Sequence, residues 1–147
     1  MIYEKLAVVG SRLKEKTSEQ IEYSNKVSEI LFAILERFHK KYSPTLLISG
    51  GASGIDSKAE LWADSKNISK FIIRPNWYPN GHDKPMDRGA GFKRNKLIID
   101  AADYVIAMTT GSNGTANSIE WAKKLNKPLA VFDMSGILLE TRNLKNP

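Results

Sequence analysis

The sequence contains no cysteine. This absence excludes disulfide bonds, thiol catalysis and cysteine-ligated zinc, and it suits a reducing compartment. The chain also lacks a long uninterrupted apolar run, and residues 1–10 place charged side chains before a brief apolar stretch. We therefore expect neither a signal peptide nor a membrane span, and we expect a cytoplasmic protein.

Histidine is also scarce, because only His39 and His82 are present. Neither has further ligands at a spacing typical of metal sites, so the sequence predicts no metal site and no bound cofactor. Basic residues outnumber acidic ones, 22 to 16, which gives a formal net charge of +6. They are dispersed without interleaved aromatics, so a solvated lysine-rich surface is favoured over a dedicated nucleic-acid face.

The composition is sufficient for one globular domain, since 41% of the 147 residues are hydrophobic and 26% are charged. A chain of this length can bury a sizeable core without covalent cross-links. No repeat, linker or second domain is visible. We expect residues 1–133 to form the domain and residues 134–147 a C-terminal tail, with a final turn of helix at 137–139.

Apolar runs and helical periodicity alternate along the chain. Strands are predicted at 5–9, 45–49, 68–73, 104–108 and 129–132. The first helix is predicted between a cap at Thr17 or Ser18 and a stop at Ser43-Pro44, and further helices at 54–66, 91–101 and 113–125. Residues 74–90 form a long irregular loop, which in a compact domain is more often functional than idle.

This alternation predicts an α/β fold: a single Rossmann-like domain of three layers, with a mainly parallel five-stranded sheet in the order 3-2-1-4-5 and helices on both faces. In that order the chain reverses direction between the first and fourth strands. Ligands of open α/β sheets bind at such a switch, outside the carboxyl ends of the strands. The sequence therefore predicts a binding site there.

Glycine turns follow the first, second and fourth predicted strands. They comprise Gly10 with Ser11 and Arg12, residues 50–54, and residues 111–115. Such turns let backbone N–H groups point at an anion, as a helix N-terminus also does. Each could be an ordinary strand-to-helix turn, but their convergence on one edge of the sheet favours a phosphate site.

Several polar side chains lie close to these turns. Arg12 offers a planar fork of donors for phosphate or carboxylate, and Arg94 with Asn95 could hold a phosphate or a sugar edge. Asp56 could accept hydrogen bonds from ribose hydroxyls, or it could simply cap its own helix. Trp77 could stack on a base, or it could anchor the long loop to the core.

Four motifs in this order resemble the SLOG superfamily of Rossmann-like proteins, in particular its YspA/YpsA-related members. The residues that carry the resemblance are Val9 to Arg12, Ser49 to Asp56, Ala90 to Asn95, and Gly114 with Thr115. The resemblance covers almost the whole chain and implies binding of nucleotides or nucleotide-derived molecules. Relatives include the Lonely Guy phosphoribohydrolases and the SMF/DprA proteins that bind single-stranded DNA.

The turns and the resemblance together predict one ligand pocket. The residues expected to bind the ligand are Gly10, Ser11, Arg12, Gly50, Gly51, Ser53, Asp56, Arg94, Asn95, Gly114 and Thr115. The hydrolase relatives place a glutamate two or three residues after the Gly-Thr pair, whereas this chain has Asn117 and Ser118 there. Asparagine cannot act as a base or stabilise an oxocarbenium-like transition state by charge. The remaining catalytic candidates are Arg94, Glu120 and Asp56.

The leading hypothesis is a binding module. It would hold a phosphorylated nucleoside, such as an ADP-ribose-like or NAD-derived molecule or a nucleoside monophosphate, as a sensor or sequestering protein. One alternative is an enzyme that hydrolyses the N-glycosidic bond of a nucleoside monophosphate. The other is a single-stranded nucleic-acid binder, which ranks last because stacking aromatics are few. A homodimer is a further option, in which the long first helix or the tail would supply the apolar surface of the interface.

Overall fold

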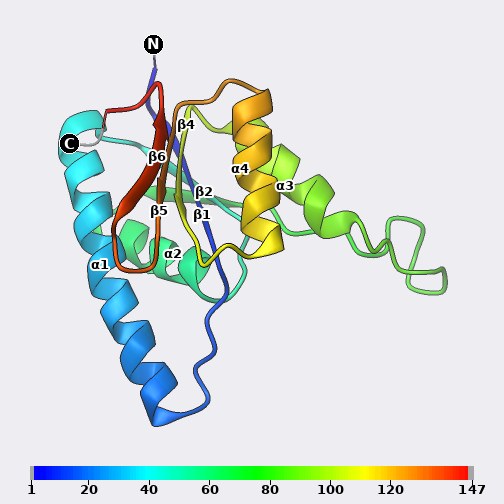
Figure 1. Cartoon of the computed structure of the whole chain (residues 1–147). Coiled ribbons are helices and arrows are strands. Elements are labelled where there is room, and N and C mark those ends of the chain that lie inside the picture. The colour runs from blue at the N-terminus through cyan, green and yellow to red at the C-terminus, as the bar shows by residue number, and fades with distance from the viewer. Residues whose placement is uncertain (1, 146–147) are drawn as a thin grey trace.

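The computed structural model describes residues 2–145, which form a three-layer α/β domain (Figure 1). The strands are β1 (Lys5–Gly10), β2 (Leu46–Ser49), β3 (Ser69–Ile72), β4 (Tyr104–Met108), β5 (Leu129–Phe132) and β6 (Leu138–Arg142). The helices are α1 (Ser18–Tyr42), α2 (Ile55–Ser65), α3 (Ala90–Ala101) and α4 (Asn113–Lys124). The five predicted strands and the four predicted helices before residue 126 are therefore all present.

The sheet has six strands in the order β3-β2-β1-β4-β5-β6. The pairs from β3 to β5 are parallel, which confirms the predicted order and the Rossmann-like fold. Because the chain moves outward in one direction from β1 to β3 and then returns to β4 on the other side of β1, the switch point lies between β1 and β4. The carboxyl ends of these two central strands position the site.

The predicted helical turn at residues 137–139 is wrong. Residues 137–139 do not form a helical turn; instead, Leu138–Arg142 form β6, an antiparallel edge strand on β5. The positive φ of Gly136 allows the reversal of the chain, and Met134 and Leu144 on either side of β6 are buried in the core. Periodicity missed this strand because β6 is mostly exposed and so lacks the apolar alternation of a half-buried strand.

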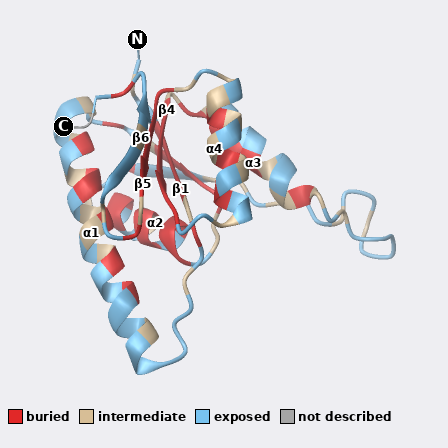
Figure 2. Ribbon diagram, viewed as in Figure 1, coloured by how far each residue is buried: buried red, intermediate tan, exposed pale blue. Residues whose placement is uncertain are grey.

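The two faces of the sheet carry separate helical layers and separate apolar cores. On one face α1 and α2 pack over side chains such as Leu6 and Val8, and on the other α3 and α4 pack over alternate residues such as Ala7 and Val9. Figure 2 shows buried positions on the helical sides turned toward the sheet. This alternation follows from the two-residue period of a strand that is covered on both faces.

The long helix α1 begins and ends as the sequence predicts. The Thr17 hydroxyl accepts a hydrogen bond from the Gln20 amide, and the Gln20 side-chain oxygen accepts one from the Thr17 amide, which completes a capping box. At the other end Ser43 adopts the left-handed conformation, with φ of 48°, just before Pro44. The first turns of α1 extend past the carboxyl ends of the central strands (Figure 1).

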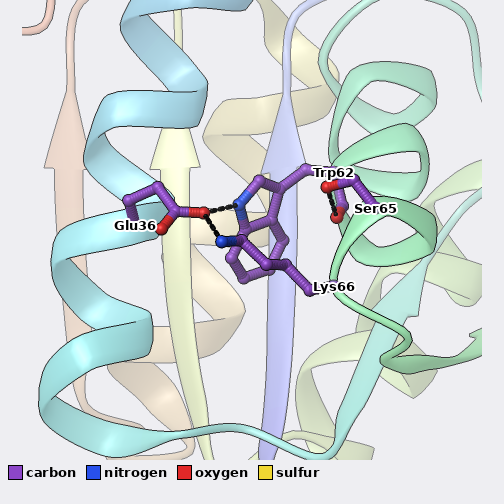
Figure 3. A network of polar contacts seen from close by, with 4 residues as sticks. All are labelled: Glu36, Trp62, Ser65 and Lys66. Carbon is purple, nitrogen blue, oxygen red and sulfur yellow. Dashed lines mark hydrogen bonds and ion pairs between the residues drawn. The ribbon is translucent and has the colours of Figure 1, made fainter.

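A polar network ties α1 to α2 on the face of the sheet that these two helices cover (Figure 3). Glu36 of α1 accepts hydrogen bonds from the Trp62 indole at 2.9 Å and from the Lys66 ammonium at 2.6 Å. The bond from Lys66 holds the pKa of Glu36 below its usual value. Ser65 donates to the Trp62 carbonyl at 2.6 Å. The network therefore fixes the end of α2 that lies away from the switch point.

Within residues 2–145, no helix is both long enough and apolar enough to cross a membrane.

Candidate functional site

A cavity of about 410 Å³ lies at the switch point, where β1 and β4 end. Its walls come from the turn after β1, the turn after β4, the first turns of α3 and α4, and the start of α2. The residues that line it are Val9, Gly10, Ser11, Arg12, Ala52, Asp56, Trp77, Gly91, Phe92, Arg94, Asn95, Ile98, Thr110, Ser112, Gly114, Thr115 and Ser118. A volume of this size suits a small organic ligand.

Hydroxyl groups from two turns meet on one wall of the cavity. The Ser11 hydroxyl lies 2.8 Å from the Ser112 hydroxyl and accepts hydrogen bonds from the Thr110 amide and hydroxyl at 3.0 and 3.1 Å. The Ser112 hydroxyl lies 3.2 Å from the Thr115 hydroxyl. These rotatable hydroxyls can redirect their hydrogens toward an incoming acceptor. The wall is therefore suited to anion oxygens.

The N-terminus of α4 opens onto the same wall. Ser112 occupies the N-cap position, and its side chain makes no capping hydrogen bond. The first amides of a helix have no acceptor within the helix, and they carry the positive end of its dipole. A Cβ added at Gly114 would meet no heavy atom within 4 Å. The backbone at Gly114 is therefore open to the close approach of an anion.

The turn after β2 has the same glycine-rich pattern, but two arginine side chains of the protein occupy the space beside its glycines. A Cβ at Gly50 would lie 2.7 Å from Nη1 of Arg94, and one at Gly51 would lie 2.7 Å from Nη1 of Arg74. Arg94 donates through Nη1 to the carbonyls of Gly50 at 2.6 Å and Ile73 at 3.3 Å. The glycines thus admit arginine side chains of this chain, and neither lines the cavity.

Gly54 and Gly10 serve close packing between the first two turns. Gly54 has φ of 88°, and a Cβ there would lie 2.6 Å from the Ser11 carbonyl oxygen. A Cβ at Gly10 would lie 2.4 Å from Cβ of Ile55. The Ile55 amide also donates to the Ser11 carbonyl at 3.3 Å. Together these contacts hold the start of α2 against the turn that carries Ser11.

Arg94 and Asn95 brace the site from α3. The Arg94 Nε donates to the Asn95 side-chain oxygen at 3.1 Å. Asn95 in turn donates through its amide nitrogen to the Gly114 carbonyl at 3.3 Å and to the Asn117 side chain at 3.2 Å. Burial lowers the pKa of Arg94, whereas the neighbouring Asp56 opposes that change. Both residues line the cavity, and both also connect its walls.

Asp56 is the carboxylate of the cavity. It lies in the first turn of α2, is 8% exposed, and accepts a hydrogen bond from the Ala52 amide at 3.2 Å. Burial raises the pKa of Asp56 to about 6, against the opposing effects of the Ala52 amide and Arg94. A carboxyl that titrates near neutral pH in a cleft is a candidate for ligand contact or proton transfer.

Two aromatic side chains stand at the mouth of the cavity. Trp77, from the loop after β3, is 37% exposed, and Phe92, on α3, is 51% exposed. A Cβ added at Gly91 would lie 3.5 Å from the Trp77 ring, so the loop rests against the first turn of α3. The tip of this loop, between β3 and α3, projects away from the sheet (Figure 1).

The structure brings most of the predicted residues to one cavity. Those that line it are Gly10, Ser11, Arg12, Asp56, Arg94, Asn95, Gly114 and Thr115, whereas Gly50, Gly51 and Ser53 do not. The catalytic candidate Glu120 is exposed and also lies outside the cavity. The ligand-binding and catalytic roles of all these residues remain predictions.

Four further lining residues were not among the predicted ligand-binding residues, although Ser112 and Phe92 lie within the predicted motifs: Thr110, Ser112, Ser118 and Phe92. The hydroxyls of Thr110 and Ser112 flank Gly111, so a search for hydroxyl side chains around the glycine turns would have found them. Phe92 and Ser118 carry no comparable signal, because a single aromatic or serine on a predicted helix is common on any surface. His39 packs edge-on against Trp62, and His82 lies against Tyr78 in the projecting loop.

The family model described as YspA, cpYpsA-related SLOG family matches residues 21–78. This match begins within α1 and continues through β2, α2 and β3, and it confirms the resemblance to the SLOG superfamily over these residues. No curated protein matches the sequence.

Solved structures share the fold. DNA processing protein A from Helicobacter pylori, described by its single-stranded DNA binding mode, matches with a TM-score of 0.59 at 23% identity. The match covers 89% of this chain and 66% of that one. DNA processing protein A from Streptococcus pneumoniae matches with a TM-score of 0.61 at 21% identity, covering 89% and 50%. The chain therefore spans only part of these two proteins.

The molybdenum cofactor binding protein from Rippkaea orientalis is also similar. It matches with a TM-score of 0.56 at 23% identity, and the match covers 90% of this chain and 78% of that one. Identities this low establish the common fold alone, so what each of these proteins binds does not carry over by itself.

Proposed function

We propose that this chain, a Rossmann-like domain of the SLOG type, binds a nucleotide or nucleotide-derived ligand in the cavity between β1 and β4, as a sensor or sequestering module. The observation that carries the proposal is the meeting of the Ser11, Ser112 and Thr115 hydroxyls with the open N-terminus of α4. Hydroxyls and free helix amides bind phosphate oxygens without needing a metal. The phosphate would therefore sit on this wall.

The remaining walls fit the rest of a nucleotide. Arg12 is an exposed guanidinium beside the phosphate wall and would neutralise its charge. Trp77 and Phe92 offer ring faces on which a base can stack. Asp56 can accept hydrogen bonds from ribose hydroxyls. An ADP-ribose-like or NAD-derived molecule and a nucleoside monophosphate both carry these groups.

Calorimetric titration with AMP and with adenosine tests the proposal. We expect AMP to bind at least about tenfold more tightly than adenosine, because only AMP reaches the phosphate wall. Ser112→Ala should weaken AMP binding and leave adenosine unaffected. Asn113→Ala is the matched control, since Asn113 is the next residue on the same turn and does not line the cavity. Equal affinities for AMP and adenosine would overturn the proposal.

A second candidate function, hydrolysis of an N-glycosidic bond, is favoured by the position of Asp56. Glu120 lies outside the cavity, so Asp56 is the carboxylate that could assist water attack or stabilise an oxocarbenium-like transition state. Incubation with AMP or NAD, followed by chromatography, would detect free adenine or nicotinamide. Turnover that is lost in Asp56→Asn would favour the enzyme, whereas binding without product would favour the sensor.

Single-stranded nucleic acid is a third candidate ligand, because the Helicobacter pylori neighbour is described by that activity and this chain carries a net charge of +6. Binding of this kind would weaken steeply with salt and would be little affected by competing mononucleotides. We also propose that the protein is located in the cytoplasm and that a homodimer is one assembly open to it. Sedimentation velocity of the purified protein would test the assembly.

A further inference from the structure

A second hollow adjoins the nucleotide cavity. It has a volume of about 320 Å³ and is lined by Arg12, Leu13, Lys14, Glu19, Gln20 and Tyr23. These residues belong to the connection after β1 and to the first turns of α1. Arg12 lines both the cavity and the hollow, so the two lie on either side of one guanidinium side chain.

Both walls of the hollow are held in place. The connection after β1 is fixed at its start, because Gly54 and the Ile55 amide pack against the backbone at Ser11. The start of α1 is fixed by the capping box, in which the Gln20 side chain accepts hydrogen bonds from the Lys16 and Thr17 amides. A hollow built between two anchored segments is largely preformed, which lowers the entropic cost of binding.

The chemistry of the hollow resembles that of a second nucleoside site. Tyr23 is 48% exposed and offers a ring face next to the apolar Leu13. Among residues 2–145, no carboxylate oxygen lies within 4.0 Å of a side-chain nitrogen of Arg12 or Lys14. The Glu19 carboxylate at the rim can accept hydrogen bonds from ribose hydroxyls. The hollow thus combines a stacking surface with two cationic side chains that form no ion pair among the described residues.

We propose that the ligand consists of two nucleoside-like units joined through phosphate. This inference rests on the proposed function: the first unit occupies the cavity, with its phosphate on the wall of Ser11 and Thr115. The bridging phosphate passes Arg12, and the second sugar or base lies in the hollow against Tyr23. Pyrophosphate-bridged and phosphodiester-bridged molecules share this chemistry, since both carry anionic oxygens between two sugar-bearing units.

Calorimetric titration of the full chain with three probes tests the inference. AMP fills only the cavity, ADP-ribose adds a pyrophosphate and a second ribose, and a 5′-phosphorylated adenine dinucleotide adds a phosphodiester and a second base. We expect at least one of the larger probes to bind about tenfold or more tightly than AMP, because it gains the second set of contacts. The stronger of the two identifies the type of bridge.

Substitutions of residues that line the hollow test whether the second unit of the ligand binds there. Tyr23→Ala and Lys14→Ala should each reduce the advantage of the larger probe about fivefold and leave AMP binding unchanged, because neither residue lines the cavity. Ile21→Ala is the matched control: Ile21 is 44% exposed on the same turns of α1 and does not line the hollow. It should leave all three affinities unchanged.

The outcomes separate this inference from the function on which it rests. If AMP binds but neither larger probe gains affinity, the two-unit ligand is wrong and the nucleotide site stands. An advantage that persists in both Tyr23→Ala and Lys14→Ala would place the second unit elsewhere and would overturn the inference. If none of the three probes binds, the proposed function fails, and the inference fails with it.

Discussion

The turn after β2 and the turn after β4 share one glycine-rich sequence pattern. A side chain of the protein fills the space beside the first turn, whereas the space beside the second is open. At Gly50 the guanidinium of Arg94 occupies the space next to the backbone and donates to two carbonyls. At Gly114 an added Cβ would have no heavy atom within 4 Å beyond its chain neighbours and the backbone of its own helix. A strand followed by glycine therefore indicates that something approaches the backbone closely, and it does not specify whether that is the protein or a ligand.

The two arginines of the cavity have different tasks. Arg94 joins the ends of β2 and β3 to α3, whereas Arg12 is exposed and extends between the cavity and the hollow. The first is needed to build the site and the second is available to a ligand.

Arg94→Met should cause the largest loss of stability. It removes the charge-assisted bonds to Gly50, Ile73 and Asn95, so we expect the free energy of unfolding to fall by about 4 kcal/mol. Arg12→Met, a matched change on an exposed side chain, should alter it by less than about 0.5 kcal/mol and instead weaken AMP binding. Urea unfolding and calorimetry measure the two effects. Equal losses of stability would remove the distinction between the arginines.

Asp56→Asn should change how stability depends on pH. Because the pKa of Asp56 is raised from 3.8 to about 6 by burial, the folded chain binds more protons than the unfolded chain between these values. The contribution of Asp56 to stability therefore declines as pH rises through this window, and at pH 8 it opposes folding by about 3 kcal/mol at most.

The asparagine variant lacks this opposing contribution. It should match the wild type near pH 4 and exceed it in stability above pH 6, as measured by urea unfolding across that range. A difference in stability that stays constant with pH would show that Asp56 titrates normally in the folded chain.

Alanine at the two glycines gives the smallest changes in stability and the clearest contrast. Gly50→Ala must displace the Arg94 guanidinium, so it should cost about 2 kcal/mol. Gly114→Ala meets open space in the first turn of α4 and should gain about 0.5 kcal/mol, as alanine does in helices. The same change should weaken AMP binding about tenfold by blocking the backbone. Thermal unfolding of both variants measures the opposite changes in stability, and calorimetry measures AMP binding. A stable Gly114→Ala variant with unchanged AMP affinity would contradict the prediction.

Most of the fold was predictable because its signals are local and repeated. The buried strands read as continuous apolar runs, and the α1 stripe recurs at helical spacing down to Phe38. The edge strand β6 was not predictable from the sequence, because its side chains are largely exposed. It becomes a strand only because the chain turns back after β5 and pairs with that strand in the antiparallel direction. Its identity as a strand depends on tertiary pairing rather than on its own pattern.

The candidate site was predictable in its position and less so in its details. The strand order alone places a cavity at the ends of β1 and β4. That Arg94 would reach Gly50, 44 residues away in the sequence, depends on how α3 packs, and no local pattern encodes it. The hydroxyl contacts of Ser11 with Thr110 and Ser112 depend on β1 and β4 being neighbours in the sheet.

The position of the phosphate in a crystal structure grown with AMP tests the central claim most directly. We predict phosphate oxygens within about 3 Å of the Gly114 or Thr115 amides and of the Ser11 or Ser112 hydroxyls, with Arg94 still bound to the Gly50 carbonyl. A phosphate on the Gly50–Gly51 turn, with Arg94 and Arg74 displaced from it, would contradict the account.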